Sequence, residues 1–166
     1  MVVSKKIRWC QAKGLKLIEP NSNLSSLYIK YALETLNELR TTNSNMWIAT
    51  QKYYLEYFLA TAILMKLGIS SKIHECTFEI IKLLENNNII DFRFNELLEK
   101  DKNLRIENQY YLKNNNIIIN YEEIINLISK IKTICNSITL KQMIHIKKQL
   151  TLLTKTSHPK SSYKRH

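Results

Sequence analysis

Glycine and proline are almost absent from this chain of 166 residues, which has only two of each. These residues form most of the tight turns that an all-β fold or an alternating β/α fold needs between its short elements. Their scarcity argues against both fold classes and favours long helices with few connections. A chain of this length is able to bury a sizeable core as one domain.

Cysteine is also scarce. The three cysteines, Cys10, Cys76 and Cys135, are far apart in the sequence and form no Cys-x-x-Cys pair. Their odd number and wide spacing predict neither a disulfide framework nor a zinc site, and they indicate a reducing compartment. We predict no metal and no cofactor, because the sequence has no glycine-rich phosphate loop, nucleophile elbow or cluster of metal ligands.

Long apolar runs are missing as well. The longest, YFLATAILM at 57–65, is far short of the about 20 residues that a transmembrane helix needs. The first 20 residues contain no continuous apolar segment of the kind found in secretion signals. We therefore expect a soluble, cytoplasmic protein that does not associate with membranes.

The net charge of +11 is confined to the two ends of the chain. Residues 1–23 carry five Lys or Arg against one acidic residue, and residues 139–166 carry seven against none, whereas 24–138 have equal numbers of both signs. Basic ends on a neutral body are typical of proteins that bind a polyanion such as nucleic acid. The alternative is a lysine-rich composition with solvated ends.

Apolar residues recur at helical spacing along most of the chain. Segment 45–67 is apolar on nearly all sides, so we expect a central helix there, ended by Gly68 in a left-handed conformation. Asn120 and Glu123 form a capping box at the start of a later helix. The predicted helices cover 24–40, 45–67, 71–85, 94–112 and 121–138, followed by a weaker one over 140–154.

These elements predict an all-α fold, an up-and-down bundle of four or five helices with basic N- and C-terminal extensions. Residues 1–23 would form a basic N-terminal arm, 24–138 the bundle, and 139–166 a basic C-terminal helix and tail. The segment NNNIIIN, 114–120, has three isoleucines of high β propensity. It has no partner strand, so we expect a connection between helices there.

Three segments in this order resemble the HEPN family of small helical domains associated with nucleotides and RNA. They are ATQKYYLEYFLATAILMKLGI (49–69), SSKIHECT (70–77) and LRIENQYYL (104–112), and the resemblance covers about residues 24–138. It implies a helical bundle that forms a homodimer. It also implies partnership with a minimal nucleotidyltransferase, often as a toxin–antitoxin pair, and metal-independent RNA cleavage in active members.

Active members of that family carry an Arg and, four to six residues later, a His. Here Arg105 is present, but Tyr110 stands five residues on, and 109–112 contain no His. An arginine suits phosphate oxygens because its planar fork binds them bidentately. A tyrosine, with an ordinary pKa near 10, is a poor base for the RNA 2′-hydroxyl. Arg105 and Tyr110 are therefore the candidate catalytic residues of a protein expected to cleave RNA weakly or not at all.

Helical geometry adds a constraint. Positions five apart on a regular helix point about 140° away from each other. Arg105 and Tyr110 would then share a site only if the helix distorts or a second subunit completes the site. The alternative is that Arg105 pairs with Asp101, one turn earlier, while the tyrosines pack in the core.

The residues predicted to bind RNA or nucleotide combine this motif with the basic helix that follows the bundle. They are Arg105, Asn108, Tyr111, Lys141, Lys147 and Lys148. His74 is interpreted as a polar residue in the first turn of a helix, structural or flanking the site. Tyr53, Tyr54 and Tyr57 could form a stacking platform, but their apolar helix favours a place in the core or at a dimer surface.

Three functions fit these observations. The first is a HEPN-like module that binds RNA or nucleotide and is non-catalytic or weakly catalytic. The second is a metal-independent endoribonuclease toxin of a toxin–antitoxin pair, with a substituted active site. The third is a helical partner subunit of a minimal nucleotidyltransferase.

Overall fold

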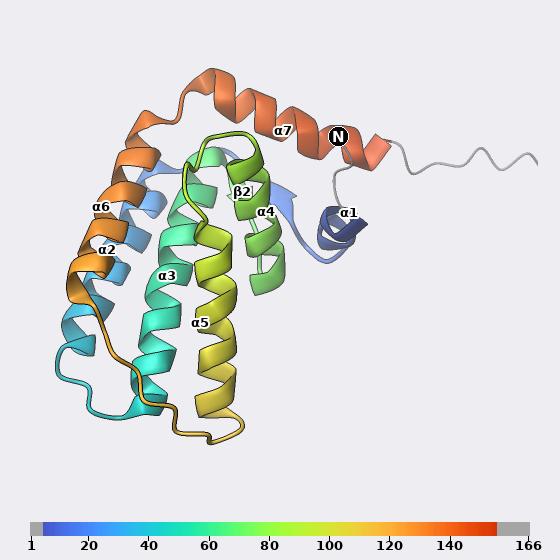
Figure 1. The fold of residues 1–166 in the computed structure, drawn as a ribbon. Helices are drawn as coiled ribbons and strands as arrows, with labels where there is room; N and C mark the ends of the chain where they lie inside the picture. Colours follow the sequence, from blue (N-terminus) through green and yellow to red (C-terminus); the bar gives the residue numbers. More distant parts are fainter. Residues whose placement is uncertain (1–4, 156–166) are drawn as a thin grey trace, which may run out of the picture.

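Helices make up nearly all of the regular structure in this computed structural model, which describes residues 5–155 (Figure 1). The only strands in this part of the chain, β1 (Lys16–Leu17) and β2 (Ile69–Ser70), form one short antiparallel pair. The predicted all-α fold is confirmed. The helices are α1 (Lys5–Ala12), α2 (Ser22–Leu39), α3 (Asn45–Leu67), α4 (His74–Asn86), α5 (Phe94–Gln109), α6 (Tyr121–Ser137) and α7 (Leu140–Lys155).

The centre of the bundle is α3, as its apolar sequence predicted. Leu55, Leu59 and Ile63 have no exposed surface, and α2, α4, α5 and α6 all pack against this helix. The four long helices α2, α3, α5 and α6 run side by side, whereas α7 crosses one end of the bundle (Figure 1). Between residues 5 and 155 no helix combines the length and the apolar character needed to cross a membrane.

The end of α3 and the start of α6 lie where the sequence predicted them. Gly68 is the C-cap of α3 in a left-handed conformation, with φ of 74°, and a side chain there would collide with the backbone oxygen of Ile18. The Asn120 side chain accepts a hydrogen bond from the Glu123 N–H at 3.3 Å, which confirms the cap of α6. Residues 114–120 form no strand.

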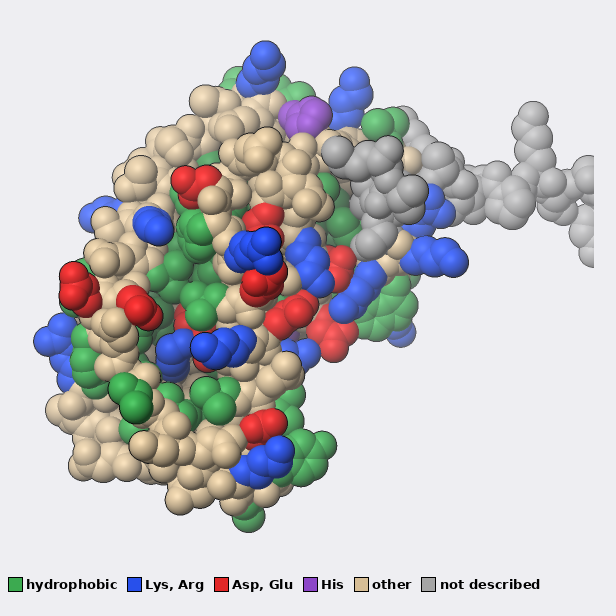
Figure 2. Space-filling model, in the orientation of Figure 1, with side chains coloured by type: hydrophobic (Ala, Val, Ile, Leu, Met, Phe, Trp, Pro, Cys, Tyr) green, Lys and Arg blue, Asp and Glu red, His purple; other side chains and the backbone are tan. Residues whose placement is uncertain are grey.

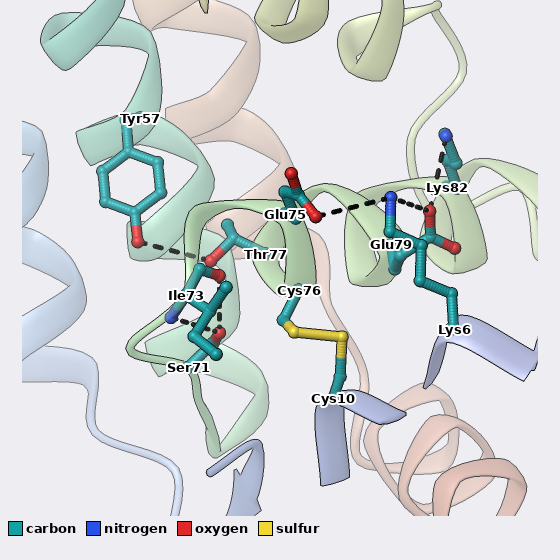
Figure 3. The surroundings of a disulfide bond; sticks show 10 residues. All are labelled: Lys6, Cys10, Tyr57, Ser71, Ile73, Glu75, Cys76, Thr77, Glu79 and Lys82. Carbon is teal, nitrogen blue, oxygen red and sulfur yellow. Dashed lines mark hydrogen bonds and ion pairs between the residues drawn. A yellow bond between two sulfur atoms is a disulfide. The ribbon is translucent and has the colours of Figure 1, made fainter. Parts of the chain in front are cut away.

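The N-terminal segment differs most from its prediction. In place of a separate basic arm, α1 packs against α4, and Ile7 and Cys10 are buried. Cys10 and Cys76 are joined by a disulfide with their Cα atoms 5.5 Å apart (Figure 3). The prediction of no disulfide is therefore wrong: the two cysteines are 66 residues apart, and only the packing of α1 on α4 brings them together.

The C-terminal extension follows its prediction as far as the described residues reach. The expected weak helix is α7, whose Ile146 and Leu150 are buried. It is connected to the N-terminal segment by two hydrogen bonds, from Gln11 Nε2 to the Leu150 carbonyl at 2.7 Å and from Lys147 Nζ to the Ile18 carbonyl at 2.8 Å. The predicted tail over 156–166 lies outside the described residues.

Candidate functional site

Three helices meet around a group of aromatic side chains in the half of the bundle that holds the start of α3. Tyr53 and Tyr54 come from α3, His74 from the first residue of α4, Arg105 from α5, and Tyr110 from the position directly after α5. We call these five residues the Arg105 site. Tyr53 is fully buried, Tyr54, His74 and Arg105 are half-buried, and Tyr110 is 63% exposed.

A short turn sets the position of His74. The Ser71 hydroxyl donates to the Ile73 carbonyl at 3.0 Å, and its oxygen receives the Ile73 N–H at 3.3 Å. This turn stops the chain from continuing as strand after β2 and starts α4 at His74. The N-cap residue of α4 is Ile73, which has no side-chain cap bond.

Arg105 lies against the two tyrosine rings of α3. Its Cζ atom is 5.1 Å from the Tyr53 ring centroid and 5.2 Å from that of Tyr54, which is cation–π geometry. Its Nε donates to Gln109 Oε1 at 3.0 Å. No carboxylate in residues 5–155 forms an ion pair with it; the alternative of a pair with Asp101 is wrong, because Asp101 pairs with Lys52.

Arg105 and Tyr110 do share a site. Arg105 Nη2 lies 3.5 Å from the Tyr110 hydroxyl. The expectation that they would point apart assumed a helix continuing to residue 112. Instead α5 ends at Gln109, three residues earlier, and the two long side chains meet at its C-terminal end.

His74 supplies the imidazole of this site and comes from the start of α4. Its Nδ1 is hydrogen-bonded to the Tyr53 hydroxyl, and its ring stacks on Tyr57 with centroids 3.9 Å apart and planes 11° apart. Burial, and then the positive charges of Arg105 and Lys102, lower the pKa of His74. This shift favours the neutral imidazole, which is the form that can accept a proton.

An ion cluster lies next to the Arg105 site, between α3 and α5. Lys52 forms ion pairs with Glu56, at 2.8 Å, and with Asp101. Both acidic side chains are almost fully buried, and Glu56 Oε2 has no hydrogen-bond partner. Burial raises the pKa of Glu56 well above its ordinary value, and the neighbouring Lys52 ammonium opposes that shift. The cluster fixes α5 on α3 one turn before Arg105.

Asn108 and Tyr111, both predicted ligand residues, differ in their surroundings. Asn108 is buried; its Nδ2 donates to the Leu104 carbonyl at 3.2 Å, and its Oδ1 accepts from the Asn115 N–H at 2.6 Å. These bonds give it a structural role, holding the chain that leaves α5. Tyr111 is 69% exposed and follows Tyr110 at the edge of the site.

The predicted lysines of α7 are not near Arg105. Lys147 reaches the Ile18 carbonyl beside Gly68, at the C-terminal end of α3, whereas Tyr53 lies near the N-terminal end. The 15 residues between Tyr53 and Gly68 correspond to about 22 Å along the helix. Lys141 and Lys148 are exposed on the same helix as Lys147. A ligand would have to span most of the bundle to contact both regions.

Opposite charges are interspersed on the surface beyond these sites. Figure 2 shows Lys and Arg side chains next to Asp and Glu across the face formed by α5 and α6, in keeping with the neutral body predicted from the sequence. In residues 5–155 no three His, Cys, Asp or Glu side chains lie close enough together to hold a metal ion.

Comparisons with known proteins add no relative: no family model, no curated protein and no solved structure matches this chain. The class that the structure itself defines is an all-α bundle with an arginine held on aromatic rings.

Proposed function

We propose that this protein is a HEPN-like module that binds RNA or a nucleotide at the Arg105 site. One observation carries the proposal: the Arg105 guanidinium is held on two tyrosine rings and has no carboxylate partner in the described part of the chain. Its Nη groups remain able to bind a phosphate through two parallel hydrogen bonds, because within residues 5–155 the one side chain hydrogen-bonded to them is Tyr110, through its hydroxyl at 3.5 Å.

Aromatic side chains next to Arg105 supply surfaces for bases. Tyr110 and Tyr111 are 63% and 69% exposed, and a base can stack on either ring without regard to sequence. The ligand class that fits is therefore single-stranded RNA or a nucleotide, with the phosphate at Arg105 and the base on a tyrosine.

The matched test uses two arginines of the same region of chain. Arg105→Lys keeps the positive charge but loses the planar guanidinium that can form two parallel hydrogen bonds. Arg93→Lys makes the same change at an exposed arginine that pairs with Glu96 at 2.8 Å. We expect the affinity for a labelled single-stranded RNA, measured by fluorescence anisotropy, to fall about tenfold in Arg105→Lys, the loss of one bidentate contact of about 1.4 kcal/mol. Arg93→Lys should bind as wild type. Equal affinity in all three proteins would rule out the Arg105 site.

A second candidate function, metal-independent RNA cleavage, is favoured by the position of His74. This ring and the Arg105 guanidinium both contact Tyr53 and Tyr54, so a base and a phosphate binder lie on the same two rings. The 2′-oxygen would attack phosphorus as its proton passes to the free ring nitrogen of His74, while Arg105 stabilises the phosphorane. The P–O5′ bond would break, and the 5′-oxygen would take a proton from water.

The products of that step are a 2′,3′-cyclic phosphate and a 5′-hydroxyl. Incubating the protein with RNA and EDTA tests it. We expect slow cleavage by wild type, loss of cleavage in His74→Gln, and RNA affinity in His74→Gln within about twofold of wild type, since binding depends on Arg105. Intact RNA after incubation with wild type, or full cleavage by His74→Gln, would reject the enzyme and leave the binding module.

We also propose a homodimer and a nucleotidyltransferase partner, as the HEPN resemblance implies. A continuous aromatic surface supports an interface next to the Arg105 site: Tyr31 and Phe58 have ring centroids 5.9 Å apart, and Phe58 and Tyr54 6.2 Å apart. Tyr31 is 41% exposed and Trp47 52%. Light scattering at micromolar concentration should give the mass of a dimer, and Tyr31→Glu should shift it to the monomer.

A further inference from the structure

A second cationic region lies on another face of the bundle, in a cavity of about 400 Å³ between α2 and α6. Its charged lining residues are all lysines: Lys30 from α2, Lys66 from the end of α3 and Lys132 from α6. Serine hydroxyls of α2 line the same cavity, and none of the acidic side chains in the described part of the chain does. A volume of this size lies within the about 300–1,000 Å³ range of small-molecule sites.

The three lysines are only partly neutralised. Lys66 Nζ donates to the Ser22 hydroxyl at 3.0 Å, which places its ammonium at the cavity wall. Lys30 pairs with Glu34 at 3.6 Å, an exposed contact that contributes little. Lys132 has no ion pair in residues 5–155. Three like charges around one cavity repel one another, and an anion between them would relieve that repulsion.

The cavity also has an apolar side. Ile29 and Leu33 of α2 line it one and two turns beyond the serines, and Leu33 is 45% exposed. At its floor, the buried Ser25 hydroxyl donates to the Ala62 carbonyl at 2.8 Å, and Cys135 is buried. The anionic part of a ligand would therefore sit at the lysine and serine end, with an organic body against the two apolar side chains.

We infer that this cavity binds a small phosphate monoester, its phosphate held by Lys66 and Lys132 and its body lying on Ile29 and Leu33. A phosphate monoester supplies up to two negative charges and three acceptor oxygens, enough for several ammonium and hydroxyl donors. The inference does not rest on the function proposed for the Arg105 site: Lys66 lies 13 residues from Tyr53, about 20 Å along α3.

Isothermal titration calorimetry of the full chain with adenosine 5′-monophosphate tests this site. Adenosine is the uncharged probe, and inorganic phosphate is the probe that lacks an organic group. We expect saturable binding of the monophosphate, weaker binding of phosphate, and none of adenosine. Lys66→Gln and Lys132→Gln should each weaken monophosphate binding at least tenfold. Lys130→Gln is the matched control, because Lys130 is on the same helix but lies over the Phe92 ring, 5.3 Å from its centroid.

Arg105→Ala separates the two sites. If the cavity binds the monophosphate, Arg105→Ala, which disables the Arg105 site, still binds adenosine 5′-monophosphate saturably, and adding Lys66→Gln to it weakens that binding at least tenfold. If Arg105→Ala loses that binding while Lys66→Gln and Lys132→Gln keep it, the nucleotide binds at the Arg105 site and the cavity proposal is overturned. No saturable binding by wild type at millimolar concentration also overturns it. A melting curve for each variant shows that lost binding is not lost folding.

Discussion

Arg105 and the α7 lysines are the two cationic regions that the sequence indicated for nucleic acid, and they are built in different ways. Arg105 is half-buried, lies on two rings and is hydrogen-bonded to Gln109. Lys141 and Lys148 are exposed, and Lys147 is bonded to a backbone carbonyl. A fixed guanidinium can select a phosphate by geometry, whereas exposed lysines contribute charge through flexible stems. The number of cationic residues in a segment therefore does not show how well that segment can select a phosphate.

The side chains of the Arg105 site are held in position by contacts that lie outside the site. Cys76, which is in the disulfide with Cys10, follows His74 by two residues on α4. Asp101, in the ion cluster with Lys52, precedes Arg105 by one turn of α5. Exposed lysines on α7 have no comparable support.

The largest loss of stability should come from breaking the disulfide. It closes a loop of 66 residues, so Cys10→Ser should lower the free energy of unfolding by about 4 kcal/mol. Thermal unfolding followed by circular dichroism measures this. Reductant should lower the melting temperature of wild type but leave that of Cys10→Ser unchanged, which is the control. A wild-type melting temperature that ignores reductant would mean that α1 is held by packing alone.

A smaller loss should follow Asp101→Ala in the ion cluster. Removing one partner of a buried pair costs about 3–5 kcal/mol, but Lys52 keeps its ion pair with Glu56, so we expect about 2 kcal/mol. The exposed pair of Arg93 and Glu96 is the control, and Glu96→Ala should change stability by less than about 0.5 kcal/mol. Urea denaturation measures both. Equal effects of the two variants would show that the cluster gives α5 no special support.

His74 should give the Arg105 site a pH dependence. Its folded-state pKa is lower than its unfolded value because of burial and the charges of Arg105 and Lys102. The unfolded state therefore binds more protons between the two values, so stability falls as the pH drops below about 6.5 and levels off below the folded pKa. His74→Gln lacks this contribution, and urea denaturation from pH 7.5 to 5 should show the wild-type advantage shrinking. A difference independent of pH would contradict the placement of His74.

Most of the fold could be predicted because helical signals are local. The central position of α3 followed from its apolar residues on all sides, and its end from Gly68. The start of α6 followed from Asn120. Helix α1 was missed because it has only eight residues, with Ile7 and Cys10 as its buried side chains. Such a short helix is stabilised by its contact with α4, and sequence periodicity does not report that contact.

The site could be predicted only in part. Arg105 and Tyr110 were singled out from their spacing, and they are in contact at the end of α5. For His74 the sequence left a structural and a site-flanking role open. It could not place the ring beside Arg105, because α4 brings it in from 31 residues before Arg105 and no local pattern links the two. The three tyrosines in α3 were the available signal, since Tyr53 contacts both His74 and Arg105. Asn108 matched the motif by position, but its bonds lie within the fold.

The most direct test compares the two cationic regions in one assay. Single-stranded RNA affinity is measured by fluorescence anisotropy at one ionic strength for wild type, Arg105→Ala and the double variant Lys141→Gln/Lys148→Gln. Arg105→Ala removes one positive charge and the double variant removes two, so a purely electrostatic interaction would be weakened more by the double variant. We predict the reverse: at least a tenfold loss in Arg105→Ala and about a twofold loss in the double variant. A larger loss in the double variant would contradict the account, because charge and not the fixed guanidinium would then determine binding.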